Sequence, residues 1–168
     1  MTDTEVQGWL VGRLPEDWFE GTPEVTIDRE EIVVIGRLAL PAVEGGDAAA
    51  QRSAAAGRIK RFREETRDHR IAIAREAEHR YRRKVAWGAE CGETQKLFTS
   101  LSIPVMTRLR QPERLVLDTL VDAGVARSRS DALAWCVRLV GQHQGDWIAE
   151  LREALVAVEK ARAGGPAV

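Results

Sequence analysis

Residues Val105–Gly141 read VMTRLRQPERLVLDTLVDAGVARSRSDALAWCVRLVG, and this stretch decides how the second half of the chain folds. Its order predicts a short strand, a helix, a tight turn and a second helix. From Val105 to Arg110 the residue types alternate, and a strand points successive side chains to opposite faces. The two faces are Val105, Thr107 and Leu109, and Met106, Arg108 and Arg110.

A first helix is predicted to begin at Gln111-Pro112-Glu113. Proline at the first helical position loses no intrahelical hydrogen bond, and an acidic side chain suits the positive end of a helix. Leu117, Leu120 and Val121 follow at helical spacing and form one apolar stripe. Gly124 is expected to end the helix in a left-handed conformation.

A second helix is predicted from Ser128-Arg129-Ser130-Asp131 to about Gly141. A serine followed three residues later by an acid is a capping box. After Asp131 the only charged residue is Arg138, so the helix is apolar on nearly every side. Such a helix must be buried on nearly every side, and we expect a second copy of the chain to cover it.

Three pieces of this stretch match a known family: the alternating VMTRL, the helix RLVLDTLVDAG and the helix start SRSDAL. Residues 104–141 resemble the ribbon-helix-helix DNA-binding family. The resemblance implies a homodimer in which two strands pair into an antiparallel ribbon. That ribbon would enter the major groove of double-stranded DNA, while the helices interlock as the dimer core.

The resemblance also implies which residues contact DNA. Met106 and Arg108, with Arg110 at the edge, would face the bases, and the free amides of Ser128, Arg129 and Ser130 would hold a phosphate. Two alternatives remain open for the same residues. The ribbon and helices could serve only for dimerisation. A helix-turn-helix is the weaker alternative, because its recognition helix would be the apolar segment 133–140.

The N-terminal part predicts a hairpin after a short helix near Glu5–Arg13. The segments Glu24–Ile27 and Glu31–Leu38 are rich in Val and Ile, with Asp28-Arg29-Glu30 between them as a turn. Ile32–Ile35 shows no alternation, which predicts a strand covered on both faces.

One long helix is predicted over residues 47–84. Its apolar stripe is Ile59, Phe62, Thr66, Ile73, Ala77 and Tyr81. A third strand, Lys84–Gly88, would return to the hairpin. Residues 1–99 would then form an N-terminal domain with a β-β-α-β unit, and the chain as a whole an α+β fold.

The second domain is expected to cover residues 100–162, with Glu93–Leu101 as the bridge to the ribbon. Asp146 can cap a last helix from Trp147 to about Arg162. The tail, 163–168, contains two glycines and a proline and is expected to be disordered.

Charge is unevenly distributed, although the net charge is only −1. Residues 1–47 carry 3 basic and 11 acidic side chains, and residues 48–84 carry 12 basic and 5 acidic ones. The favoured interpretation is that the basic helix packs against the acidic segment. The alternative is that its basic face, including Arg67 and Arg70, contacts nucleic-acid phosphates. The secondary contacts in that case are Arg75, Arg80, Arg82, Arg83 and Lys84.

Several classes of function find no support in the sequence. The N-terminus has no basic start followed by an apolar run, and no apolar stretch is long enough to span a membrane, so a cytoplasmic protein is expected. Cys91 and Cys136 are not at metal-ligand spacing with any histidine, so no metal or cofactor is expected. No glycine-rich phosphate loop, HExxH or GxSxG motif is present, and we expect no enzymatic activity.

The sequence therefore predicts a dimeric DNA-binding protein, a transcriptional regulator whose N-terminal domain contacts an effector or partner. One alternative is an adaptor or scaffold that uses the ribbon-helix-helix module only to dimerise and binds protein through the N-terminal domain. Another is an RNA- or ribosome-associated protein that uses the basic helix.

Overall fold

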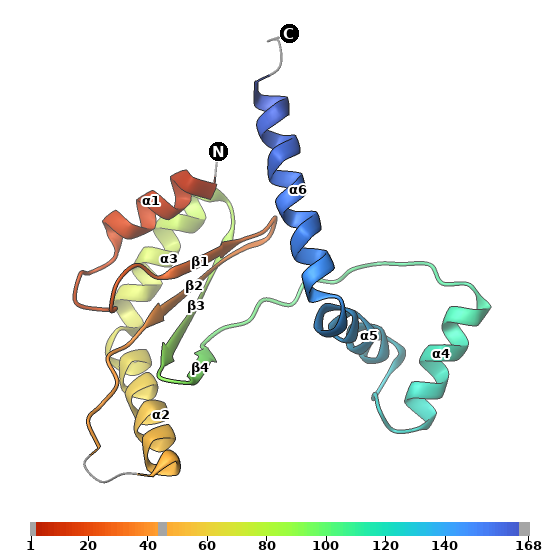
Figure 1. Ribbon diagram of the computed structural model, residues 1–168, viewed down its shortest axis with the longest axis horizontal. Helices are drawn as coiled ribbons and strands as arrows, with labels where there is room; N and C mark the ends of the chain where they lie inside the picture. The colour runs from red at the N-terminus through yellow and green to blue at the C-terminus, as the bar shows by residue number, and fades with distance from the viewer. Residues whose placement is uncertain (1–2, 44–46, 165–168) are drawn as a thin grey trace. The chain divides into compact units, whose positions relative to one another are not determined.

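The computed structural model describes residues 3–43 and 47–164, and the chain divides into two units, Met1–Pro104 and Val105–Val168. It is a mixed α+β fold (Figure 1). In the first unit the elements are α1 (Asp3–Arg13), β1 (Glu24–Ile27), β2 (Glu31–Arg37), α2 (Ala48–Glu65), α3 (Arg67–Tyr81), β3 (Lys84–Cys91) and β4 (Thr94–Leu97). In the second they are α4 (Gln111–Asp122), α5 (Arg129–His143) and α6 (Gly145–Ala163).

The sheet of the first unit has the order β1-β2-β3-β4. The hairpin β1–β2 is antiparallel, β2 and β3 are parallel, and β3–β4 is again antiparallel. The predicted β-β-α-β unit is thus confirmed, with α2 and α3 forming the crossover that a parallel pair requires. Strand β4 lies in the segment that was expected only to bridge to the ribbon. A turn at Gly92, whose φ is +56°, allows β4 to fold back on β3.

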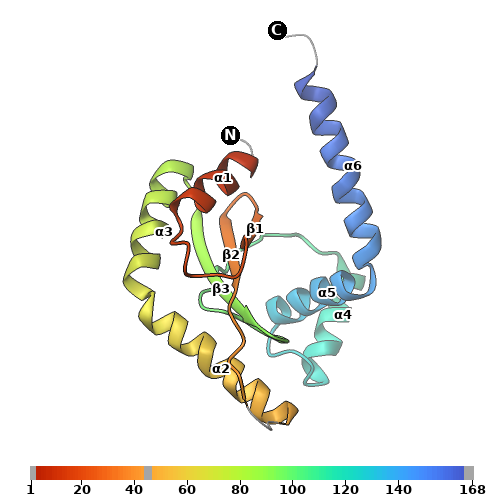
Figure 2. The ribbon, with the colours of Figure 1, turned by 60° about the vertical axis from the view of Figure 1, so that its left-hand side comes forward.

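The long helix predicted over 47–84 is divided at Thr66, so that prediction was wrong. Figure 2 shows the change of direction between α2 and α3. Thr66 has φ −95° and ψ 3°, and its hydroxyl donates a hydrogen bond to the carbonyl of Phe62 at 2.6 Å. A hydroxyl bonded back to the preceding turn commonly bends a helix. The predicted apolar stripe is confirmed, since all of its residues are buried.

The strand covered on both faces is β3 and not β2. In β2, Ile32 and Val34 are fully buried, whereas Val33 and Ile35 are only partly buried. In β3 the four consecutive residues Ala86–Ala89 are all buried. Both crossover helices, α2 and α3, contact β3, which lies between β2 and β4 in the sheet.

The second unit contains the predicted helices, but residues 101–110 form no strand. A strand needs a neighbouring backbone to pair with, and among the described residues no strand pairs with this segment. The turn after α4 is confirmed. Gly124 has φ +72°, its amide donates to the carbonyl of Val121, and the amide of Val125 donates to that of Leu120. These two bonds form the Schellman arrangement.

The last helix also differs from the prediction. Only Gln144 separates α5 from α6, which begins at Gly145 with no side-chain cap from Asp146. The helix includes Ala163, where a disordered tail was expected, and residues 165–168 of that tail lie outside the described residues.

Candidate nucleic-acid interface

The segment predicted to read DNA is exposed. The side chain of Met106 is 97% accessible and that of Val105 is 85% accessible. Arg108 and Arg110 are exposed as well, and Arg110 has extended dihedrals, with φ −78° and ψ 173°. Leu109 is the exception, because it packs against the small core of the second unit. The segment therefore has one side chain turned inward and its cationic side chains turned to solvent.

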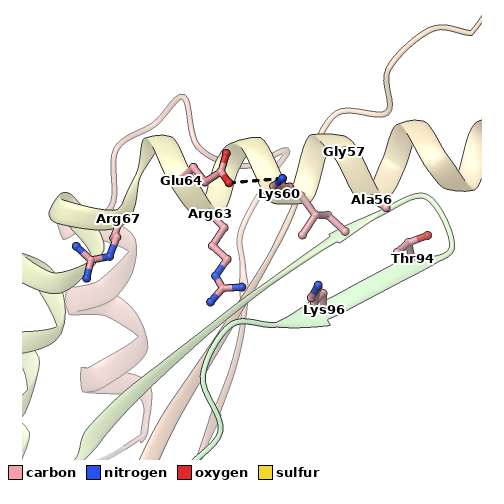
Figure 3. Close-up of a pocket in the computed structure, with 9 residues that line it drawn as sticks. Ala56, Gly57, Lys60, Arg63, Glu64, Arg67, Thr94 and Lys96 are labelled. Atoms are coloured by element: carbon pink, nitrogen blue, oxygen red, sulfur yellow. Dashed lines mark ion pairs between the residues drawn. The ribbon is translucent and has the colours of Figure 1, made fainter.

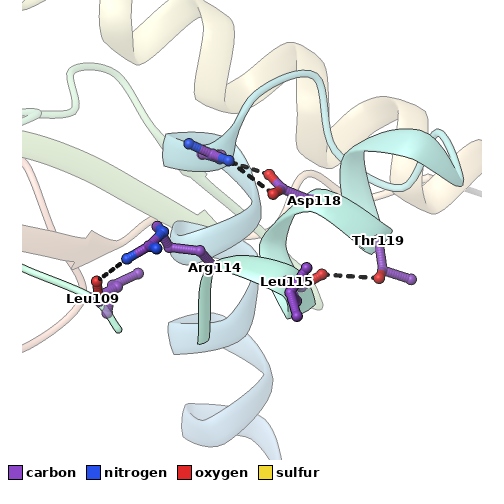
Figure 4. A network of polar contacts seen from close by, with 6 residues as sticks. Leu109, Arg114, Leu115, Asp118 and Thr119 are labelled. Carbon is purple, nitrogen blue, oxygen red and sulfur yellow. Dashed lines mark hydrogen bonds and ion pairs between the residues drawn. The ribbon is translucent and has the colours of Figure 1, made fainter. Parts of the chain in front are cut away.

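Arg114 fixes the end of this segment to helix α4. Its Nη1 donates a hydrogen bond to the carbonyl oxygen of Leu109 at 2.7 Å (Figure 4). Because Arg114 lies on the first turn of α4, the contact holds the segment at the point where it enters the helix. The side chain of Arg114 thus binds a backbone carbonyl at the C-terminal end of the segment, and the contact constrains only that end.

The start of α5 forms a cap much as predicted. Ser128 Oγ accepts a hydrogen bond from the amide of Asp131 at 3.2 Å. The Asp131 carboxylate accepts from the amide of Arg127 at 3.0 Å, and this bond lowers the pKa of Asp131. The amides of Arg129 and Ser130 belong to the first turn of the helix, where amides have no intrahelical acceptor. They remain suited to an anion such as phosphate.

The side chain of Arg129 has a structural role. Its guanidinium donates two hydrogen bonds to the carboxylate of Asp118, at 2.6 and 2.7 Å. This contact lowers the pKa of the Asp118 carboxyl. Of the six residues predicted to bind DNA, Arg129 is thus committed to joining α5 to α4, and only its backbone is left for a phosphate.

The second unit has a small core and many uncovered apolar side chains. The buried residues of this core, among those that the structure describes, are Leu117, Ala126 and Ala132. Large apolar side chains with about half or more of their area accessible occur on all three helices: Leu115, Val116, Val137, Val140, Trp147, Leu155 and Val156. A unit of this size normally needs a larger core, a metal or a second copy to be stable.

The predicted secondary contacts differ in their exposure and in their partners. Lys84 pairs with Glu78 at 2.8 Å, and the guanidinium of Arg80 lies 5.5 Å from the ring centre of Tyr81. Arg83 is partly buried, and Arg82 ends α3 with φ 57°. Arg75 is exposed.

The ion pair that joins α1 to α3 has its charges reversed relative to the expectation, because the acidic segment supplies the cation and the basic helix supplies the anion. It links Arg13 of the acidic segment to Glu76 at 2.7 Å. The structure instead assembles a different set of cations, Lys60, Arg63 and Arg67 of α2 and α3 with Lys96 of β4, around a groove (Figure 3). Of these, only Arg67 was singled out from the sequence. For Lys60, Arg63 and Arg67, the sequence feature that could have indicated this cluster is their spacing of three and four residues, because residues at that spacing are neighbours on a helix surface.

Two protein-family models match the chain. One, described as Rv1265-like protein, N-terminal domain, matches residues 4–97, which is more than half of the chain. The chain belongs to the Rv1265-like family. The second model, the Mb1296 C-terminal domain, matches residues 110–162, so residues 98–109 lie between the two.

Relatives in two mycobacterial species are similar to almost the whole chain. The uncharacterized protein Rv1265 of Mycobacterium tuberculosis is 60% identical over 158 residues, covering 94% of this chain and 69% of the relative. The uncharacterized protein Mb1296 of Mycobacterium bovis gives the same values. No solved structure matches the chain.

Two further findings concern the residues that the structure describes. None of their helices has the length and apolar character needed to cross a membrane. Within the same residues, no three side chains of His, Cys, Asp or Glu come together as metal ligands would.

Proposed function

We propose that two copies of this chain pair their residues 105–110 into an antiparallel ribbon that binds double-stranded DNA, as in ribbon-helix-helix transcriptional regulators. One observation carries the proposal. Residues 105–110 are largely exposed, and within the part of the chain that the structure describes their amides donate no backbone hydrogen bond; the segment precedes helices whose apolar side chains are largely uncovered. A second copy satisfies both needs at once, because it supplies the missing backbone partner and covers the helices.

The alternation of the segment supports the orientation of the ribbon. Leu109 already packs inward, and Thr107 and Val105 share its strand face by periodicity. The opposite face would carry Met106, Arg108 and Arg110, of which both arginines are exposed. Neither arginine forms an ion pair with any carboxylate whose side chain the structure describes. Their charges are therefore free for phosphates or base edges.

Helix α5 would add a phosphate contact at each end of the ribbon. The Arg129 and Ser130 amides point out of the first turn, where the helix dipole favours an anion. The ion pair between Arg129 and Asp118 would hold that turn in place against α4. The N-terminal unit would then contact an effector or a protein partner.

Fluorescence anisotropy with short duplexes tests the proposal. Wild-type protein should bind at about 50 mM salt and lose affinity steeply by about 200 mM, because several phosphate contacts release counterions. Arg108→Ala should cost about 1–3 kcal/mol of binding free energy. Arg152→Ala is the matched control, since Arg152 is an exposed arginine of the same unit on α6.

Three results would contradict the proposal. Equal losses in Arg108→Ala and Arg152→Ala would reveal only a general charge effect. Duplex binding that survives Arg108→Ala but not charge reversal at Arg75 and Arg80 would move the interface to the basic helix. A stable dimer with no affinity for DNA would leave the segment as a dimerisation device.

A further inference from the structure

Helices α2 and α3 and strand β4 border a groove of about 620 Å³ in the first unit (Figure 3). This volume falls within the range of roughly 300–1,000 Å³ typical of small-molecule sites. One end is lined by the small or apolar residues Ala56, Gly57 and Ile59. The remainder is mostly cationic, with Lys60, Arg63, Arg67 and Lys96.

The cations of the groove are poorly neutralised. Lys60 is 3.9 Å from Glu64, the only carboxylate that lines the groove. Arg67 is 3.7 Å from its neighbour Asp68, whose side chain is 94% accessible and so largely screened by solvent. Among the described residues, no carboxylate forms an ion pair with Arg63 or Lys96. The groove therefore carries a net positive charge.

A buried arginine behind the groove adds to this charge. Arg70 is only 6% accessible, yet it has no ion pair with any carboxylate that the structure describes. Its guanidinium donates to Thr66 Oγ1 at 2.9 Å and to the carbonyl of Arg63 at 2.6 Å. It also lies 4.9 Å from the ring centre of Phe98, against which Arg63 packs at 5.9 Å.

The surroundings of Arg70 disfavour the charged form of its guanidinium. Burial lowers the pKa of its guanidinium, and the charges of Arg63 and Arg67 lower the pKa further. A buried charge is normally matched by an opposite one, because desolvation is expensive. An anion held by the groove would bring an opposite charge to Arg63, whose carbonyl Arg70 contacts.

We propose that the groove between α2 and β4 binds a small phosphorylated ligand. Phosphate oxygens accept from the planar fork of an arginine and from lysine ammonium groups, and both kinds of donor are present. The apolar part of the ligand lies at the other end. A Cβ added at Gly57 would meet no atom within 4 Å, so the helix surface there is open. The inference does not depend on the DNA-binding proposal, because its residues belong to the first unit.

Calorimetric titration of the full chain with tripolyphosphate, at about 50 mM salt, tests the site. Wild-type protein should bind with a dissociation constant below about 1 mM. Lys96→Gln and Arg63→Gln should each weaken binding about tenfold. Arg61→Gln is the matched control and should bind as wild type, because Arg61 is an exposed arginine of α2 that does not line the groove.

Folding of the variants is checked by circular dichroism and urea unfolding. Arg63→Gln keeps the backbone carbonyl that Arg70 uses, and Lys96 is an exposed residue of β4. Absence of tripolyphosphate binding by wild type at millimolar concentration would overturn the proposal. Equal weakening by Arg61→Gln would also overturn it, since the helix would then attract anions without a site. Duplex binding lost in Lys96→Gln, with no tripolyphosphate binding, would assign the cations to nucleic acid instead.

Discussion

Replacing Val137 with lysine should dissociate the proposed dimer. Val137 lies on α5 and is 65% accessible in a single chain. Burying a whole valine side chain contributes about 1.5–3 kcal/mol, so covering that fraction contributes about 1–2 kcal/mol in each copy. In a symmetric dimer the same residue counts twice, which gives about 2–4 kcal/mol, and an unpaired buried charge adds to the loss. The dimer dissociation constant should therefore rise by roughly 30-fold to 1,000-fold or more.

Sedimentation equilibrium of the full chain measures this change. The matched control is Val11→Lys on α1, where the side chain is 50% accessible and belongs to the first unit. The control should sediment as wild type. A wild-type protein that is monomeric at about 50 µM would refute the reasoning, and so would a Val137→Lys protein that remains dimeric as tightly as wild type.

Two further predictions concern stability. A Cβ at Gly36 would overlap the ring of Phe19, so Gly36→Ala should destabilise the first unit by about 1–3 kcal/mol in urea unfolding. Gly57→Ala, in an open helix position, should instead stabilise it by about 0.5–1 kcal/mol. A Gly36→Ala protein that is more stable than the Gly57→Ala protein would contradict the packing described. In the wild type, the ion pair with Arg129 holds the folded-state pKa of Asp118 below its unfolded-state pKa. The ion pair therefore stabilises the folded protein above about pH 4, and this stabilisation is lost on acidification. The variant Asp118→Asn lacks this contribution. The urea midpoint of wild type should therefore fall more between pH 7 and pH 3 than that of the variant, and identical falls would exclude this contribution.

Local patterns were the part of the fold that the sequence could predict. The stripe through Ile59, Phe62 and Ile73 is buried as its spacing indicates. The left-handed Gly124 and the capping Ser128 are where residue chemistry places them. Each of these features depends on a few residues within one or two turns, which is the range over which helix periodicity and capping act.

Features that depend on distant segments were not predictable in the same way. Strand β4 has the sequence TQKL, which lacks an apolar alternation, and it forms because the edge of β3 is available for pairing. Arg70 lies in the buried stripe, whereas the arginine residue type predicts a position on the charged face of the helix. The groove could not be predicted from the sequence, because Lys96 and Arg63 come to line it together only after the sheet is assembled.

Hydrogen exchange of the amides between Pro104 and Pro112 tests the paired ribbon most directly. These amides donate no backbone hydrogen bond to any residue that the structure describes, so a monomer should exchange them at the unprotected rate. At concentrations well above the dimer dissociation constant, the ribbon predicts protection of roughly 100-fold for the paired amides, and Val137→Lys should abolish it. A wild-type dimer whose residues 105–110 still exchange without protection would contradict the ribbon.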